Sequence, residues 1–386
     1  NVGYARIKNF QQQTAKNLRK AIESMKKQNG PLKGLILDLR NNPGGLLRQA
    51  VRIGDLFLTQ GTVVTTIGSG NKVREERVAS PKRSLAKIPI VVLVNEESAS
   101  ASEIVAGAIK NHNRGLIIGQ KTFGKGSVQV LYEIDDAALK LTIAQYLTPG
   151  DESIQGVGIT PHIELAPMTV AKRGVELNLS NTGGESRFKN HLRNDKRVRK
   201  QKPEARVQYL EDSEKNDKEL DFPVQLAKQI ILDSGQQRAD QMLTRAKPVL
   251  ELAKREQTNR LVQALSSINI DWRQGKHPSQ TRLKTRLSVD SKHNRVKAGQ
   301  TLKITYAVTN EGKEDAYRVR GLSRSETHLL NGRDFVLGHI PAGQTRRASI
   351  TVDIPRATAS QRFPLHADLY LDSAKKPSKH YRNIFL

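Results

Sequence analysis

Apolar residues follow two different periods in the first part of the chain, one typical of buried strands and the other of helices. Residues 88–94 form an unbroken, β-branched apolar run, and residues 35–39 repeat the pattern, as expected for strands buried on both faces. The segment after Ser100 instead places apolar residues three and four positions apart: Ala101, Ile104, Val105, Ala108 and Ile109. Strands that alternate with helices in this way predict an α/β domain with a largely parallel sheet.

The same patterns predict the other elements of this domain. Helices are expected at residues 12–28 and 46–58. Strands are expected at residues 2–10, 62–67, 72–78, 115–119, 128–134 and 139–146, the last two as a hairpin.

The pattern changes twice beyond residue 220. Residues 222–268 carry apolar residues at helical spacing, which predicts a spacer of two or three helices packed on the α/β domain. Residues 282–386 alternate with period two, as in Leu302-x-Ile304-x-Tyr306, and glycine-rich turns separate the runs. Roughly seven short strands over about 100 residues predict an immunoglobulin-like β-sandwich. We expect this module to bind a ligand or to act as a spacer between other parts of the protein. A fold alone does not identify the ligand.

We therefore expect four parts in the chain. They are an α/β core at 1–168, a basic and partly mobile linker at 169–221, a helical spacer at 222–278 and the β-sandwich at 279–386. Residues 186–206 hold nine Lys or Arg and two acidic residues. This segment is either a solvated connector or a patch that binds an anionic surface.

Composition narrows the classes of partner. The 386 residues include 64 Lys and Arg against 38 Asp and Glu, a formal net charge of +26. Such a charge favours anionic partners. Aromatic residues make up only 4% of the chain, so base-stacking surfaces for single strands are poorly supplied and we expect no nucleic acid partner. A nucleic-acid binder is the alternative that rests on the charge alone. The absence of cysteine excludes disulfides and thiolate zinc sites, and it leaves the compartment open. We expect no cofactor or metal.

The chain shows no secretion signal and no apolar run of 18 residues. It begins at Asn1, inside a predicted strand. We therefore expect it to be a fragment or a processed form of a longer protein.

Candidate chemistry lies where the strand 88–94 leads into the helix after Ser100. A serine at such a corner can reach solvent beside the free N–H groups of the helix start. The alternative is a capping box, because Ser100 and Glu103 have the required spacing. Lys125 lies between two glycines, which indicates a constrained backbone, although it could also be an ordinary loop lysine.

Four motifs together resemble one family. They are 38–45 (Asp-Leu-Arg-Asn-Asn-Pro-Gly-Gly), 98–104 (Ser-Ala-Ser-Ala-Ser-Glu-Ile), 122–129 (Thr-Phe-Gly-Lys-Gly-Ser-Val-Gln) and 155–161 (Gln-Gly-Val-Gly-Ile-Thr-Pro). In this order they resemble the carboxyl-terminal processing proteases, also called tail-specific proteases. The resemblance covers residues 1 to about 165. It implies the sheet-and-helix core shared with the Clp protease and crotonase folds, and a serine/lysine dyad.

By this resemblance Ser100 is the nucleophile, Lys125 is the general base, and Gln129 orients the lysine. Ser98 and Ser102 are then structural, although the residues alone leave either one open as the nucleophile. A serine hydroxyl needs a neighbouring base, and a lysine can be that base only when it is neutral. An amide such as that of Gln129 can orient a neutral amine without supplying a charge that would keep it protonated.

The resemblance also implies an oxyanion hole. One backbone N–H comes from Gly44 or Gly45, and the other from Ala101. Paired glycines after a strand can turn N–H groups toward a site. The alternative is an ordinary turn, because Asn-Asn-Pro-Gly-Gly favours turns in any protein.

The resemblance implies a serine endopeptidase that cleaves unfolded or tail-exposed proteins in the bacterial envelope, either periplasmic or secreted. Its expected partners are a polypeptide substrate, an adaptor or regulator, and further copies in an oligomer. Two departures from the family stand out: residues 1–10 cannot form the usual PDZ domain, which we expect upstream of Asn1, and His162 replaces an acidic residue. The alternative is a catalytically silent envelope scaffold that binds through its basic surface and β-sandwich.

Overall fold

The chain divides by its contacts into two compact units, and each is described by itself. Unit 1 comprises Asn1–Ala166, Asn181–Val207 and Asn216–Lys254, and unit 2 comprises Pro167–Ser180, Gln208–Lys215 and Arg255–Leu386. The computed structural model describes residues 1–68, 74–81, 85, 87–171, 174–177, 185, 201–211, 220–275, 282–291, 294–358, 360, 362–371, 374–376 and 381–385.

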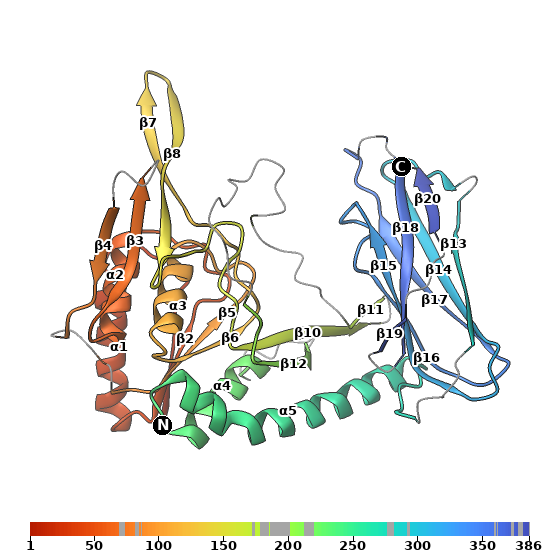
Figure 1. The fold of residues 1–386 in the computed structure, drawn as a ribbon, viewed down its shortest axis with the longest axis horizontal. Coiled ribbons are helices and arrows are strands. Elements are labelled where there is room, and N and C mark those ends of the chain that lie inside the picture. The colour runs from red at the N-terminus through yellow and green to blue at the C-terminus, as the bar shows by residue number, and fades with distance from the viewer. Residues whose placement is uncertain are drawn as a thin grey trace. The chain divides into compact units, whose positions relative to one another are not determined.

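A parallel sheet forms the centre of unit 1 (Figure 1). Its strands are β1 (Val2–Arg6), β2 (Gly34–Asp38), β5 (Ile90–Val94), β6 (Leu116–Gly119) and β10 (Ile163–Ala171), and each pairs in parallel with the next. β2, β5 and β6 are fully buried, which confirms the prediction from their unbroken apolar runs. The α/β class of this domain is confirmed.

Three helices share a core with one face of this sheet. They are α1 (Thr14–Asn29), α2 (Leu47–Phe57) and α3 (Ala101–Asn111). Alternate strand residues such as Leu35 and Ile90 belong to the same apolar core as the inward faces of these helices. α3 begins directly after Ser100, so this packing fixes the strand-to-helix corner.

A fourth helix covers the opposite face, to which Ile36 and Val91 point because strand side chains alternate. α4 (Phe222–Ser234) contacts β1, β2, β5 and β6 there. The contact is close enough to require glycine at position 34, where a Cβ would lie 2.4 Å from Ile231 Cγ2. α4 therefore packs on the α/β core, as was expected for the helices of this segment.

A second, antiparallel sheet adjoins the helices of unit 1. Its order is β4-β3-β8-β7, with β9 also paired to β8. In the described sheet β7 is an edge strand, and Figure 1 shows β7 and β8 as a long hairpin that extends beyond the helices. The bounds are β3 Thr62–Gly68, β4 Arg74–Val78, β7 Ser127–Ile134, β8 Ala137–Thr148 and β9 Glu152–Ser153. The predicted hairpin is confirmed.

Unit 2 contains two antiparallel sheets that bury one common apolar core. One sheet has the order β13-β14-β17, and the other has the order β16-β15-β18-β19 with β20 paired to β18. This arrangement confirms the all-β prediction for the C-terminal part. The bounds are β13 Leu283–Val289, β14 Thr301–Asn310, β15 Ala316–Ser325, β16 Asp334–Ile340, β17 Thr345–Asp353, β18 Arg362–Leu371, β19 Ala374–Lys376 and β20 Tyr381–Phe385.

The segments between these regions differ from the expected linker and spacer. β11 (Gly174–Glu176) pairs with β10, and β12 (Ala205–Leu210) does so as well, so parts of the expected linker are strands of a sheet. α5 (Ala239–Ser267) contains residues of both units, so the expected spacer 222–278 is not a separate unit. The basic residues 186–200 lie outside the described residues. None of the described helices has an apolar stretch long enough to cross a bilayer.

Candidate active site

Ser100 occupies the N-cap position of α3, and its backbone has φ 53° and ψ −111°. A positive φ is unusual for a residue with a Cβ, and such strain costs on the order of 1–3 kcal/mol. The side chain is half-buried. Strained residues of this kind persist when the surrounding structure holds them, and they concentrate at functional sites.

The two neighbouring serines are fully buried, and both hydroxyls are committed to the backbone of the adjacent loop. Ser98 Oγ donates to Leu39 O at 2.8 Å, and Ser102 Oγ donates to Asn42 O at 2.9 Å. Their burial and hydrogen bonds support the structural role expected for these two serines. Ser100 is the only one of the three that is not fully buried.

The glycine pair lies directly against this corner. A Cβ on Gly44 would lie 2.9 Å from Ser100 Cβ and 3.0 Å from the backbone nitrogen of Ala101, at a φ of 104°. Only glycine fits there. The N–H of Gly44 donates to Asn42 Oδ1 at 2.9 Å, whereas the N–H of Gly45 has no partner among the described residues. The glycine turn predicted for this stretch therefore lies directly against Ser100 and the backbone nitrogen of Ala101.

Glu103 connects the serine segment to the lysine segment. Its Oε2 accepts hydrogen bonds from the backbone N–H of Ser100 and from that of Lys125, each at 2.8 Å. Its Oε1 accepts from the N–H of Gly124 at 2.7 Å and from Thr122 Oγ1 at 2.6 Å. Because one carboxylate oxygen binds both backbones, the residue predicted as nucleophile and the residue predicted as base are held side by side.

The Glu103 carboxylate is completely buried. Burial raises its pKa to about 7, and the four hydrogen bonds from Thr122, Ser100, Gly124 and Lys125 oppose that rise. The capping interaction predicted for Glu103 is present in its bond to the Ser100 N–H. Its bonds to the lysine segment were not predicted, because that segment lies about twenty residues away in sequence.

The 155–161 motif supports the lysine segment from its other side. Gln155 is buried, and its Oε1 accepts from the N–H of Gly126 at 3.0 Å. The N–H of Gly156 donates to Gly124 O at 2.8 Å. Lys125 therefore has hydrogen-bonded neighbours on both sides: the Glu103 carboxylate and the loop that contains Gln155.

The side chains of the predicted dyad are not joined directly. No hydrogen bond links Ser100 Oγ with Lys125 Nζ among the residues that the structure describes, and Lys125 is half-buried. Gln129 is exposed on β7, where its Nε2 donates to Thr142 Oγ1 at 3.3 Å. The orienting role of Gln129 therefore stays a prediction.

An ion-pair network anchors the base of the glycine loop. Asp38 is buried at the end of β2, and Arg40 Nη2 contacts its Oδ2 at 2.7 Å. Although burial disfavours its charge, the hydrogen bonds and charge of Arg40 lower the pKa of Asp38. Arg40 Nη1 also lies 2.8 Å from Asp221, whose side chain caps α4 by accepting from the N–H of Val224. The loop that carries the glycines is thus tied to α4.

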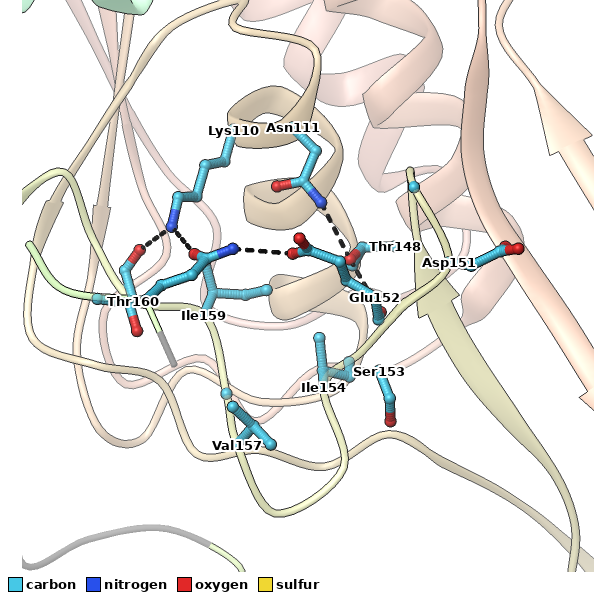
Figure 2. A pocket seen from close by; sticks show the side chains of 13 residues that line it. Lys110, Asn111, Thr148, Asp151, Glu152, Ser153, Ile154, Val157, Ile159 and Thr160 are labelled. Carbon is cyan, nitrogen blue, oxygen red and sulfur yellow. Dashed lines mark hydrogen bonds between the residues drawn. The ribbon is translucent and has the colours of Figure 1, made fainter. Parts of the chain in front are cut away.

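A separate polar cavity of about 150 Å³ lies at the C-terminal end of α3 (Figure 2). There the ammonium of Lys110 donates to Thr160 O at 2.6 Å and also to Gln201 Oε1. Gln201 in turn donates to Glu152 Oε2 at 2.9 Å, as Figure 2 shows. Burial lowers the pKa of Lys110. These polar groups satisfy one another, and no residue predicted for catalysis lines the cavity.

The described residues contain no group of three or more His, Asp or Glu side chains placed to hold a metal ion. A strained serine at a strand-to-helix corner, beside backbone N–H groups and a clamped lysine segment, is the arrangement expected of a serine hydrolase that uses a lysine base.

Comparison with known proteins identifies the family of this part of the chain. Residues 1–165 match the model of peptidase family S41. This match, which covers less than half of the chain, confirms the resemblance drawn from the four motifs.

Three individual proteins are similar to part of the chain. The chain is 42% identical over 196 residues to a carboxy-terminal-processing protease of Bartonella bacilliformis, a match that covers 50% of this chain and 44% of the relative. It is 42% identical over 165 residues to the carboxy-terminal processing protease CtpA of Bacillus subtilis, covering 42% and 35%. A solved photosystem II D1 C-terminal processing protease is 36% identical, with 42% of each chain covered and a TM-score of 0.39. The match spans less than half the length of these relatives.

Proposed function

We propose that this chain is a serine endopeptidase of the carboxyl-terminal processing type, with Ser100 as nucleophile and Lys125 as general base. The observation that carries the proposal is the Glu103 carboxylate, which accepts from the backbone N–H groups of both residues through one oxygen. The family match of residues 1–165 and the names of the relatives support the same reaction class.

The reaction proceeds through an acyl-enzyme. Lys125 Nζ takes the proton of Ser100 Oγ as that oxygen attacks the carbonyl carbon of the scissile peptide bond. The backbone N–H groups of Gly45 and Ala101 stabilise the resulting oxyanion. We favour Gly45 over Gly44 because the N–H of Gly44 already donates to Asn42. Lys125 then protonates the leaving amine, and a water molecule, deprotonated by Lys125, hydrolyses the ester.

The amine of Lys125 must be aligned with the hydroxyl of Ser100 before the serine can attack the peptide bond. The backbone of Lys125 is held by Glu103, and we propose that rotation within the four-carbon side chain brings its amine to Ser100. Gln129 then accepts a hydrogen bond from the aligned amine, after releasing Thr142.

The proposed substrates are unfolded or tail-exposed polypeptides. β7 begins two residues after Lys125, and its outer edge carries no partner strand in the described sheet. An extended peptide can pair with such an edge, whereas a folded protein cannot present its backbone in this way. We place the enzyme in the bacterial envelope, periplasmic or secreted, and we regard the two-sheet module of unit 2 as immunoglobulin-like.

Digestion of a denatured protein tests the proposal. We expect the chain to cleave denatured casein, Ser100→Ala and Lys125→Ala to abolish cleavage, and a chelator to have no effect. Lys140→Ala is the matched control, because Lys140 is exposed on β8 away from Ser100 and its loss should leave turnover unchanged. Wild-type turnover by Ser100→Ala would refute the assignment of the nucleophile. Complete inactivity of the unmodified chain would favour the silent scaffold instead.

A further inference from the structure

The outward face of the β13-β14-β17 sheet in unit 2 has an unusual composition. Along each of the three strands, inward, mostly apolar residues alternate with mostly polar residues that point away from the core. The innermost residues, such as Leu302, Ile304 and Tyr306, belong to the sandwich core. We define the outward face by the residues between them: Lys284, Arg286, Ser288, Thr301, Lys303, Thr305, Ala307, Thr309, Thr345, Arg347, Ser349, Thr351 and Asp353.

Two arginines lie on either side of a small residue in one cross-strand row of this face. Ala307 on the central strand is directly opposite Arg286 on one side and Arg347 on the other. Both arginines are exposed. Neighbouring strands lie about 4.8 Å apart, so the two arginines start about 10 Å apart and both guanidinium groups can reach over the alanine. The row therefore forms a shallow site over Ala307, with a guanidinium group on each side.

Rows of hydroxyl groups lie on both sides of the arginine row. Thr305 Oγ1 and Ser349 Oγ are 2.8 Å apart, and so are Thr309 Oγ1 and Thr345 Oγ1. Each pair shares one hydrogen bond, which leaves the second hydroxyl of the pair with acceptor and donor capacity for a ligand. These hydroxyls therefore lie in the rows next to the arginines, where they can form hydrogen bonds with the same ligand.

The charge on the outward face is positive. Lys303 and both arginines have no acidic partner within the described residues. Lys284 is 73% exposed, and its amine lies 3.7 Å from Glu311, a distance at which an exposed pair contributes little. Three acidic side chains lie at the ends of these rows. Asp290 directly follows β13, and its backbone N–H donates to Lys303 O. Glu311 lies beyond Lys284, and Asp353 at the end of β17 accepts from Thr301.

We propose that this face binds a linear polymer of phosphate groups, with one phosphate seated over Ala307 between Arg286 and Arg347. Guanidinium forks match the oxygens of phosphate in a bidentate manner, and serine and threonine hydroxyls donate to the remaining oxygens. The proposal concerns unit 2 alone and does not depend on the peptidase activity of residues 1–165.

The composition of the face disfavours two other anionic partners, nucleic acids and lipid bilayers. It presents no aromatic side chain, so it cannot stack the bases of a nucleic acid. Its one apolar residue is Ala307, so it has no side chain to insert among lipid tails. A polymer without bases, bound through its phosphates, is the partner that uses both the arginines and the hydroxyls.

Binding of the full chain to inorganic polyphosphate across a salt series tests the proposal. Each phosphate neutralised on a flexible single strand contributes about −0.7 to the slope of log K against log salt. The double variant Arg286→Thr/Arg347→Thr should therefore reduce the slope by about 1.4. The matched control is Lys16→Gln/Lys20→Gln, which removes two exposed charges from α1 and should leave the slope unchanged. Equal losses in the two double variants would refute a specific site.

Ala307→Glu provides a second, independent variant, because it places a carboxylate between the two arginines and keeps both in the protein. We expect it to weaken polyphosphate binding at least tenfold, with an unchanged melting temperature, since the side chain points away from the core. Wild-type affinity in this variant would overturn the proposal. Equal or stronger binding of the unmodified chain to phosphatidylglycerol vesicles or to single-stranded DNA at the same salt would also overturn it.

Discussion

Replacing Glu103 with glutamine removes a buried negative charge and keeps the shape of the side chain. The amide has one acceptor oxygen, where the carboxylate has two that accept four hydrogen bonds. Backbone N–H groups of the serine and lysine segments then face an NH2 donor. We expect the two segments to separate, and a displacement of about 1 Å at a reacting group costs on the order of 100-fold in rate.

The effect of the same change on stability depends on pH. The pKa of Glu103 rises from its usual 4.5 to about 7 on folding because the carboxyl is buried. Between these two values the unfolded chain has lost the proton while the folded chain keeps it, so the free energy of unfolding of the wild type falls as pH rises. Each pKa unit corresponds to about 1.4 kcal/mol, which gives a loss of about 3 kcal/mol across the window. Glutamine does not titrate and avoids this loss.

Denaturant unfolding of both proteins from pH 4.5 to 8 measures this difference directly. We expect Glu103→Gln to gain about 3 kcal/mol relative to the wild type over that range, while its kcat on denatured casein falls about 100-fold with little change in KM. Asp55→Asn is the control, because Asp55 is also buried and accepts from the N–H of Ser80 far from the dyad. A pH-independent difference in stability, or wild-type kcat in Glu103→Gln, would refute the reasoning.

Two further substitutions test how the site is supported. Gly44→Ala places a methyl group 2.9 Å from Ser100 Cβ at a positive φ, so it should abolish measurable cleavage. Gly150→Ala is the control, because Gly150 also has a positive φ but a Cβ there has no atom within 4 Å. We expect this control to remain active and to lose about 1 kcal/mol in stability. Asp221→Ala removes the cap of α4 and the outer ion pair of Arg40, and thermal unfolding should show a loss of about 1 kcal/mol. Asp221→Asn, which keeps the cap, should lose less.

Local pattern was sufficient to predict the strands, helices and corner of the α/β core. The buried strand 90–94 and the helix 101–111 were predicted within two residues because continuous apolar runs and helical spacing are both local signals. The place of Ser100 at their junction follows from the same signals. The two sheets of unit 2 were predicted for an equivalent reason, since alternation with period two is also local.

Long-range contacts could not be predicted in this way. Glu103 was interpreted as a capping residue, and nothing in its neighbourhood of the sequence indicates its bonds to Gly124 and Lys125. The sequence holds one signal for these bonds: Glu103 lies on an otherwise apolar helix face. A buried carboxylate needs hydrogen-bond partners, so its position indicates that other segments donate to it. The apolar face of α4 predicts that this helix packs on the core, but it does not reveal which face of the sheet the helix covers. The close approach of Gly34 to that helix became visible only in the fold.

Mass spectrometric location of a fluorophosphonate adduct tests the central claim most directly. A serine activated by a neighbouring amine reacts with this reagent, whereas a buried structural serine does not. We predict a single adduct on Ser100 in the wild type, no adduct on Ser98 or Ser102, and at least a hundredfold slower modification in Lys125→Ala. An adduct on either neighbouring serine, or modification of Ser100 at an unchanged rate in Lys125→Ala, would contradict the serine/lysine dyad.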